Sequence, residues 1–161
     1  MGEVVNYESW LAEVPPSITN DPLWKTNVYR QALFVSDLAW HDTRKLMKDR
    51  SLLSLSDQLF EAIGSIGANV SEGYSRASGK DQARFYEYAL GSAREARGWY
   101  FGGRHTLGSK VANHRMNLLA TIIRQLSTMV PKYRGKQIKE EEVFYETIPL
   151  SELLQNIPMP D

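Results

Sequence analysis

The chain has 161 residues, a formal net charge of zero and no cysteine, and this length predicts a single domain with one core. Without cysteine, disulfides, thiolate metal sites and cysteine nucleophiles are excluded. Residues 1–17 lack the cationic start and apolar core of a signal peptide, and no apolar run approaches the roughly 18 to 20 residues of a membrane span, so we expect a cytoplasmic protein without a membrane partner.

The charges are distributed unevenly along the chain. Residues 1–22 contain four carboxylates and no Lys or Arg, and residues 135–161 contain six carboxylates against two lysines. The segment between them therefore carries a net charge of +8. This pattern predicts an N-terminal acidic arm over 1–22, a helical domain over 23–134 and a C-terminal acidic arm over 135–161.

Two helices are predicted in the first half of the helical domain. Apolar residues recur every three to four positions across residues 23–48, and Asp21-Pro22 is a typical helix start. After a short break, a second apolar stripe covers residues 55–70 and predicts a helix that ends at Gly73.

Two further helices are predicted in the second half. The third begins after a cap at Ser78 or Gly79. Its predicted buried stripe is Phe85, Ala89, Ser92, Ala96, Trp99 and Gly103. The fourth runs from Ser109 to Val130 and is predicted to stop at Pro131. Its predicted buried residues are Val111, Leu118 or Leu119, Ile122, Leu126 and Met129.

The short connections between these helices require successive helices to be antiparallel. The predicted fold class is therefore all-α, an up-down-up-down four-helix bundle with N- and C-terminal arms. Both arms contain apolar residues, among them Trp10, Val143 and Phe144, so we expect the arms to dock on the bundle. Residues 151–157 are expected to include one short helix capped by Ser151.

Glycine is unusually frequent inside the predicted helices, where each residue costs about 1 kcal/mol relative to Ala. The positions are Gly64, Gly67, Gly91, Gly98, Gly102 and Gly103. They serve either close packing inside the bundle or a contact between subunits. The third helix also carries more aromatic residues than one stripe can bury, namely Tyr86, Tyr88, Trp99, Tyr100 and Phe101. That surplus favours the second alternative, and we expect a homo-oligomer.

The fourth helix is the best candidate for a polyanion contact, because residues 108–134 contain no carboxylate. The candidate nucleic-acid-binding residues are Lys110, Arg115, Arg124, Lys132 and Arg134. A solvated helix face is the alternative explanation. Lys110 and Arg124 lie nearly in line along a helix, whereas Arg115 and Arg124 lie on opposite sides, so only part of this charge can meet one partner.

No catalytic or metal site is expected. None of the histidines His41, His105 and His114 has a second ligand at the spacing of a helical metal site. The sequence also lacks a Gly-x-Ser-x-Gly elbow and a phosphate-binding loop that ends in Gly-Lys-Ser/Thr. We therefore expect a protein that is not an enzyme and uses no cofactor or metal.

The stretch of residues 65–73, with the residues that follow it, resembles a known family. Its pattern Ser-Ile-Gly-Ala-Asn-Val-Ser-Glu-Gly, the Phe85 that follows it and the segment 89–92 resemble the four-helix-bundle family of 23S rRNA intervening sequence proteins. The matching motif residues, to which we assign structural roles, are Asn69, Glu72, Gly73, Arg76, Gly91, Ser92 and Glu95. We expect Glu72 to hold Arg76 and Glu95 to pair with a neighbouring arginine. Gly67 departs from the pattern, because the family usually has proline there.

The resemblance covers about residues 23–134 and implies a homopentamer without known catalytic activity and with a role connected to structured RNA. A weaker similarity links the chain to the accessory proteins of diversity-generating retroelements, which bind a reverse transcriptase and nucleic acid. Two hypotheses follow. The first is an oligomer that binds structured RNA or a ribonucleoprotein through a basic surface. The second is a protein-interaction scaffold or an accessory subunit of a nucleic-acid-processing protein, for example of a reverse transcriptase.

Overall fold

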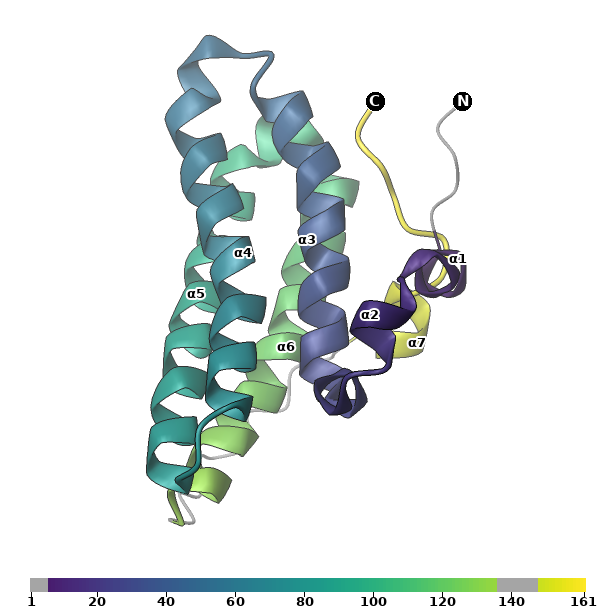
Figure 1. The fold of residues 1–161 in the computed structure, drawn as a ribbon. Coiled ribbons are helices and arrows are strands. Elements are labelled where there is room, and N and C mark those ends of the chain that lie inside the picture. Colours follow the sequence, from purple (N-terminus) through teal and green to yellow (C-terminus); the bar gives the residue numbers. More distant parts are fainter. Residues whose placement is uncertain (1–5, 136–147) are drawn as a thin grey trace.

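Four long helices make up most of the protein. The computed structural model describes residues 6–135 and 148–161, and within them all regular secondary structure is helical. The long helices are α3 (Asn27–Leu46), α4 (Leu53–Tyr74), α5 (Gly79–Leu107) and α6 (Ser109–Arg134). Successive long helices run in opposite directions (Figure 1), as expected of an up-down-up-down bundle. The all-α prediction is confirmed.

Short helical elements precede, connect and follow the long helices. They are α1 (Tyr7–Glu13), α2 (Pro16–Thr19), the 3-10 turns η1 (Pro22–Lys25) and η2 (Arg50–Leu52), and α7 (Leu150–Leu153). The predicted first helix over 23–48 is therefore two elements, because Thr26 between η1 and α3 has an extended backbone. The predicted cap at Ser151 is wrong, since α7 begins at Leu150 after Pro149.

Helix α5 packs along both α4 and α6, whereas α3 packs mainly against α4. On α5 the predicted Ala89, Ala96 and Gly103 are buried. The other buried positions include Tyr86, Ala93 and Tyr100, each one residue after the predicted Phe85, Ser92 and Trp99. These three differences follow from packing against two helices at once, because the buried surface of α5 then faces both neighbours and is wider than a single stripe. On α6 both Leu118 and Leu119 are buried, and Val130 is buried rather than Met129.

The helix ends follow local rules, with one exception. Ser78 caps α5, and its Oγ accepts a hydrogen bond from the Asp81 amide at 3.2 Å. Gly108, with φ of 86°, joins α5 directly to α6. Pro131 does not end α6, which continues to Arg134 and stops at Gly135 with φ of 74°. Only three helical residues follow Pro131, so the hydrogen bond that proline removes and any bend it causes affect just the end of the helix.

The described parts of both arms lie on the bundle, where the N-terminal arm packs against α3 and α7 contacts α6 (Figure 1). Trp10 of α1 is buried against Phe34, and its Nε1 donates to a carboxylate oxygen of Asp37 at 2.6 Å. Leu153 and Ile157 are buried in the same region. The acidic run at 140–142, Val143 and Phe144 lie outside the described residues.

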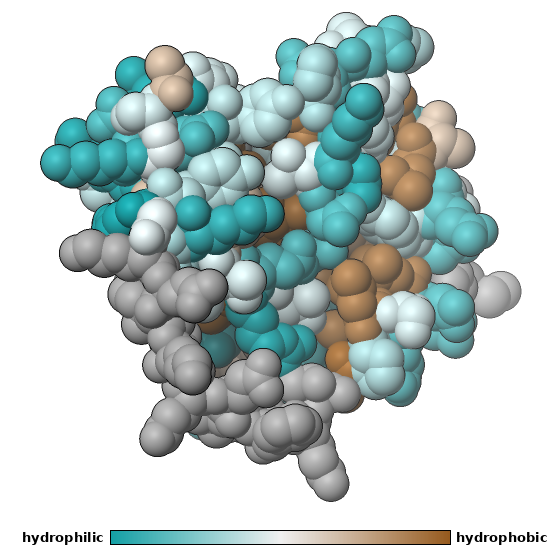
Figure 2. All heavy atoms as spheres, turned by 90° about the horizontal axis from the view of Figure 1, so that it is seen from below, coloured by the Kyte–Doolittle hydropathy of each residue, from teal (hydrophilic) through white to brown (hydrophobic). Residues whose placement is uncertain are grey.

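The surface of the bundle is mixed in polarity. Viewed from the end where α4 turns into α5, apolar side chains reach the surface in patches between hydrophilic ones (Figure 2). None of the described helices is both long and apolar enough to cross a membrane.

Candidate functional site

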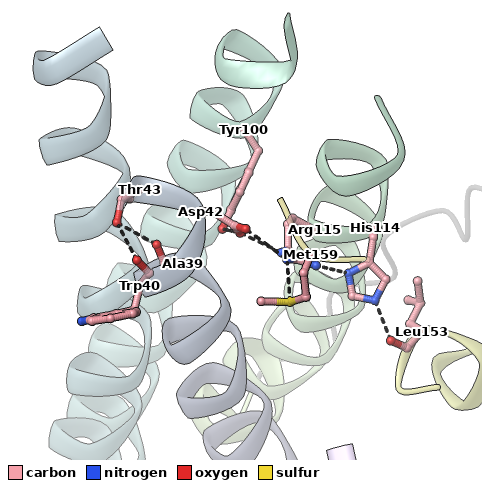
Figure 3. Close-up of polar contacts among 9 residues, drawn as sticks. All are labelled: Ala39, Trp40, Asp42, Thr43, Tyr100, His114, Arg115, Leu153 and Met159. Atoms are coloured by element: carbon pink, nitrogen blue, oxygen red, sulfur yellow. Dashed lines mark hydrogen bonds and ion pairs between the residues drawn. The ribbon is translucent and has the colours of Figure 1, made fainter. Parts of the chain in front are cut away.

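The most site-like group of polar residues is a buried cluster that joins α3, α5 and α6. Arg115 Nε donates to Asp42 Oδ2 at 2.7 Å, and its Nη2 donates to Oδ1 at 3.0 Å. The Tyr100 hydroxyl donates to the same Asp42 Oδ2 at 2.7 Å. None of these three side chains is exposed to solvent. Figure 3 shows the three groups converging from different helices.

His114 extends this cluster to the C-terminal arm. Arg115 Nη1 lies 2.9 Å from His114 Nδ1, and because a guanidinium has only donors, Nδ1 must be the acceptor. The proton is therefore on Nε2, which donates to the backbone carbonyl of Leu153 at 2.6 Å. The Met159 sulfur lies 3.7 Å from Arg115 Nη2. A neutral histidine of one defined tautomer thus ties α6 to residues 148–161 (Figure 3).

Burial controls protonation in this cluster. Desolvation, with the Asp42 carboxylate next to it, raises the pKa of Tyr100 well above its ordinary value. Desolvation, assisted by the Arg115 guanidinium, lowers the pKa of His114, although its bond to the Leu153 carbonyl acts in the opposite direction. Tyr100 is therefore a neutral hydrogen-bond donor and His114 is uncharged at neutral pH.

The cluster contains residue types that catalysis often uses, but its arrangement is that of a structural centre. Asp42 accepts from both Arg115 and Tyr100, and His114 uses both ring nitrogens within the protein. Neither Asp42 nor Arg115 reaches solvent, so no substrate can meet them in this conformation. Among residues 6–135 and 148–161, no group of three or more His, Asp or Glu side chains is placed to hold a metal ion.

The sequence did not identify Asp42 and Tyr100 as important, although one signal was present. Asp42 lies between Leu38 and Leu46 on the buried stripe of α3, and Arg115 lies between Val111 and Leu118 on that of α6. A charged residue in the apolar stripe of each of two helices predicts a buried pair.

Arg115 is therefore a correction to the predicted nucleic-acid contacts. Its side chain has no exposed surface and neutralises a buried carboxylate. The predicted separation of Arg115 from Arg124 around the helix is confirmed, since Arg124 is exposed. A residue on the inner side of α6 cannot contact an external polyanion.

The other four predicted contacts do not form one surface. Lys110 is exposed in the first turn of α6, and Lys132 is exposed in the last. At 1.5 Å per residue these two positions are about 33 Å apart along the helix. Arg134 forms an ion pair with Glu87, with Nη2 2.6 Å from Oε1. One compact ligand cannot contact both ends of this set.

The family-motif residues have mostly local structural roles. Asn69 Nδ2 donates to the Ser65 carbonyl at 2.8 Å. Glu72 and Arg76 form the predicted ion pair at 2.9 Å. Glu95 accepts a hydrogen bond from Trp99 Nε1 at 3.2 Å rather than pairing with an arginine, so that expectation is wrong.

The remaining motif residues lie on α4 and α5. Gly73 is buried, and a Cβ there would be only 2.7 Å from Tyr86 Cε1. Ser92 is half-buried on α5. Gly91 is exposed, and a Cβ there would have no packing partner within 4 Å.

The helix glycines therefore divide into two groups. Gly67 packs against Ala32 and Leu33, while Gly102 and Gly103 pack against Leu55 and Leu46. By contrast, Gly64, Gly91 and Gly98 are exposed, and a Cβ at any of them would have nothing within 4 Å. Gly64 and Gly67 line a half-open pocket of about 200 Å³ between α3 and α4. Packing inside the bundle explains the first group only.

Two of the open glycines belong to one exposed stripe along α5. We call it the outer face of α5, and it consists of Tyr88, Gly91, Glu95, Gly98 and Phe101. The spacing of three to four residues places them on one side of the helix. The Phe101 ring is 54% exposed and the Tyr88 ring 47%. A second helix could approach this stripe closely between the two aromatic rings.

Comparison with known proteins gives one match. A protein-family model described as "23S rRNA-intervening sequence protein" matches residues 25–132, two thirds of the chain. The matched segment runs from the end of η1 to the last turn of α6 and leaves both arms outside. No curated protein and no solved structure matches the chain.

Proposed function

We propose that this chain, which belongs to the 23S rRNA-intervening sequence protein family, is a non-catalytic protein that assembles with itself and binds RNA. The non-catalytic part rests on the buried cluster, in which Asp42, Arg115 and His114 use their hydrogen-bonding groups within the protein. A ring of five copies is the assembly that the family resemblance implies.

The observation that carries self-assembly is the pair Gly91 and Gly98 on the outer face of α5. Each glycine lowers helix stability by about 1 kcal/mol relative to Ala, and neither has a packing partner within 4 Å of the Cβ position. Contact with a second copy offsets this loss, because glycine lets two helix backbones approach closely. The exposed rings of Tyr88 and Phe101 would bury apolar area in the same contact.

Light scattering at micromolar concentration tests the assembly. We expect a mass that is a multiple of 18.3 kDa, with five copies as the expected number. Gly98→Leu should dissociate the assembly while circular dichroism shows the helices retained, because the space around Gly98 is open. Thr128→Leu, on the exposed surface of α6, is the matched control and should not change the mass. A wild-type mass of one chain would refute self-assembly.

RNA binding is supported by exposed cations and by the name of the family. Lys110 and other cations on the surface of the bundle are exposed, and in an assembly each is repeated in every copy. Binding that depends on such cations should weaken by orders of magnitude between about 50 and 200 mM salt. A filter-binding titration of the full chain with structured and unstructured RNA measures this. If no RNA is retained at low salt, the protein-interaction scaffold becomes the preferred function.

A further inference from the structure

The end of the bundle where α3 leads into α4 brings several chain segments together (Figure 1). Cβ atoms built at Gly102 and Gly103 would lie 3.1 Å from the side chains of Leu55 and Leu46. The ends of α3 and α5 and the start of α4 are therefore neighbours, and Gly108 joins α5 to α6 at the same end. Side chains from four helices share this surface.

This surface is basic. The segments that form it, 43–57 and 101–110, contain six cations against two carboxylates. The cations are Arg44, Lys45, Lys48, Arg50, Arg104 and Lys110, and we call this set the basic end. Within residues 6–135 and 148–161, the three ion pairs of the protein all involve other residues. The cations of the basic end are thus not neutralised by a described carboxylate.

Favourable interactions with helix dipoles explain the positions of only some of these cations. Arg44 and Arg104 lie in the last turns of α3 and α5, where a positive charge is favourable by about 0.3–1 kcal/mol. Lys110 is the second residue of α6, where the dipole disfavours a cation. The first turns of η2, α4 and α6 also lack the acidic residues that usually occupy such positions. Local helix stability therefore does not account for Lys110.

Two exposed aromatic rings accompany the cations. Trp40 is 45% exposed, and the guanidinium carbon of Arg44 lies 3.5 Å from the centroid of its ring. Phe101 is 54% exposed, with the Arg104 guanidinium 3.9 Å from its centroid, but it belongs to the outer face of α5, which the proposed assembly covers, so stacking is assigned to Trp40 alone. The Arg44 guanidinium lies over the face of Trp40, and unpaired nucleic-acid bases stack both on aromatic rings and on guanidinium planes. An acidic polypeptide would use the cations but not the rings.

We infer that the basic end binds unpaired RNA, with bases stacked on Trp40 and phosphates held by Lys48, Arg50 and Lys110. This rests on the proposed RNA binding and moves its site away from the middle and the far end of α6. Of the five contacts predicted from the sequence, Lys110 alone belongs to it. Paired bases in duplex RNA are not available to Trp40, so the surface favours single strands.

A pair of charge reversals tests the location. Lys48→Glu with Arg50→Glu alters the basic end, and Arg124→Glu with Lys132→Glu is the matched control, since all four residues are exposed and both pairs change the net charge equally. The probe is a 20-nucleotide uridine oligomer in a filter-binding titration. The first pair should weaken binding at least about tenfold and lower the slope of log K against log salt by about 1.4. The control should change affinity less than about twofold.

Substitutions at Trp40 test the stacking. Trp40→Leu should weaken binding of the uridine oligomer by about 5- to 100-fold, whereas Trp40→Phe should retain most of it. Binding of a 20-base-pair RNA duplex should be the same for both variants. Thermal melting and light scattering of each variant verify that fold and assembly are unchanged.

The outcomes separate this inference from the proposed function. If the wild type retains no RNA, the proposed RNA binding itself is refuted. If the wild type binds but both charge reversals weaken it equally, or Trp40→Leu binds like the wild type, RNA binding stands and its location at the basic end is overturned. Competition by polyglutamate as strong as that by the uridine oligomer would also overturn the inference, because the site would then recognise negative charge alone.

Discussion

On the inner face of α5, Ala89, Ala93 and Gly103 are buried, and a Cβ at Gly103 would lie 3.1 Å from Leu46 Cδ2. On its outer face, Gly91 and Gly98 are equally small, yet nothing packs within 4 Å of their Cβ positions. The inner residues are small because neighbouring helices are close. The outer glycines have no such reason within the described part of the chain, and the proposed contact with a second copy would supply one.

The two faces also differ in how they treat polar groups. On the inner face, Tyr100 completes a hydrogen-bonded network with Asp42 and Arg115, and none of the three side chains is exposed to solvent. On the outer face, Tyr88 and Glu95 remain accessible. Substitutions should therefore change stability when they touch the inner face and assembly when they touch the outer one.

The largest effect is expected from Arg115→Met. It leaves the Asp42 carboxylate buried without its cation, which should lower the free energy of unfolding by about 3–5 kcal/mol. Arg124→Met, on the exposed side of the same helix, is the control and should change it by less than about 0.5 kcal/mol. Urea denaturation monitored by circular dichroism compares the two. Equal stabilities would show that the buried pair does not hold α3, α5 and α6 together.

A pair of glycine substitutions sharpens the comparison, because the expected signs are opposite. A Cβ at Gly73 would lie 2.7 Å from Tyr86 Cε1 and 3.1 Å from the Gln82 carbonyl, so Gly73→Ala should destabilise by about 1–3 kcal/mol. Gly98→Ala has open space and should stabilise the helix by about 1 kcal/mol. Thermal melting is compared at a concentration where light scattering gives both variants the same mass. A destabilising Gly98→Ala in dissociated chains would contradict the assignment of Gly98 to the outer face.

The sequence was sufficient to predict the four long helices because each depends on a local apolar repeat. On α5 it predicted the buried Ala89, Ala96 and Gly103 correctly. The other three predicted positions were each one residue too early, since they depend on which two helices lie beside α5. The sequence also assigned Arg115 to a nucleic-acid surface, because its partner Asp42 is 73 residues away and periodicity treats each helix separately. The charge count over residues 108–134 placed the predicted nucleic-acid contacts on one helix. The cations of the basic end come from several segments of the chain, which a count along one helix does not combine.

The protonation of His114 gives a smaller, pH-dependent effect at the edge of the inner network. Burial, with the Arg115 guanidinium, lowers its pKa in the folded protein below the ordinary value of about 6.5. The folded state therefore favours neutral histidine, and this stabilisation is complete above about pH 6.5 and is lost as the pH falls further. The free energy of unfolding should be lower at about pH 5.5 than at about pH 7.5 for this reason.

His114→Gln is the control for this effect. Glutamine can donate to the Leu153 carbonyl and accept from Arg115, as the neutral histidine does, but it does not titrate. The variant should therefore lose less stability than the wild type between the two pH values in urea denaturation. The same loss in both proteins would assign the pH dependence to other groups.

The smallest effect is expected at Ser56, a buried residue of α4. Its hydroxyl is the one buried side-chain polar group among the described residues without a hydrogen-bond partner. Ser56→Ala removes an unsatisfied group and improves helix propensity, so it should raise the free energy of unfolding by up to about 1 kcal/mol. Ser65→Ala, in the same helix, separates the two contributions, because the Ser65 hydroxyl donates to the Glu61 carbonyl and is partly exposed. Ser56→Ala should be the more stabilising of the two by urea denaturation. If it is instead destabilising, the Ser56 hydroxyl has a hydrogen-bond partner in solution, such as a buried water, that the substitution removes.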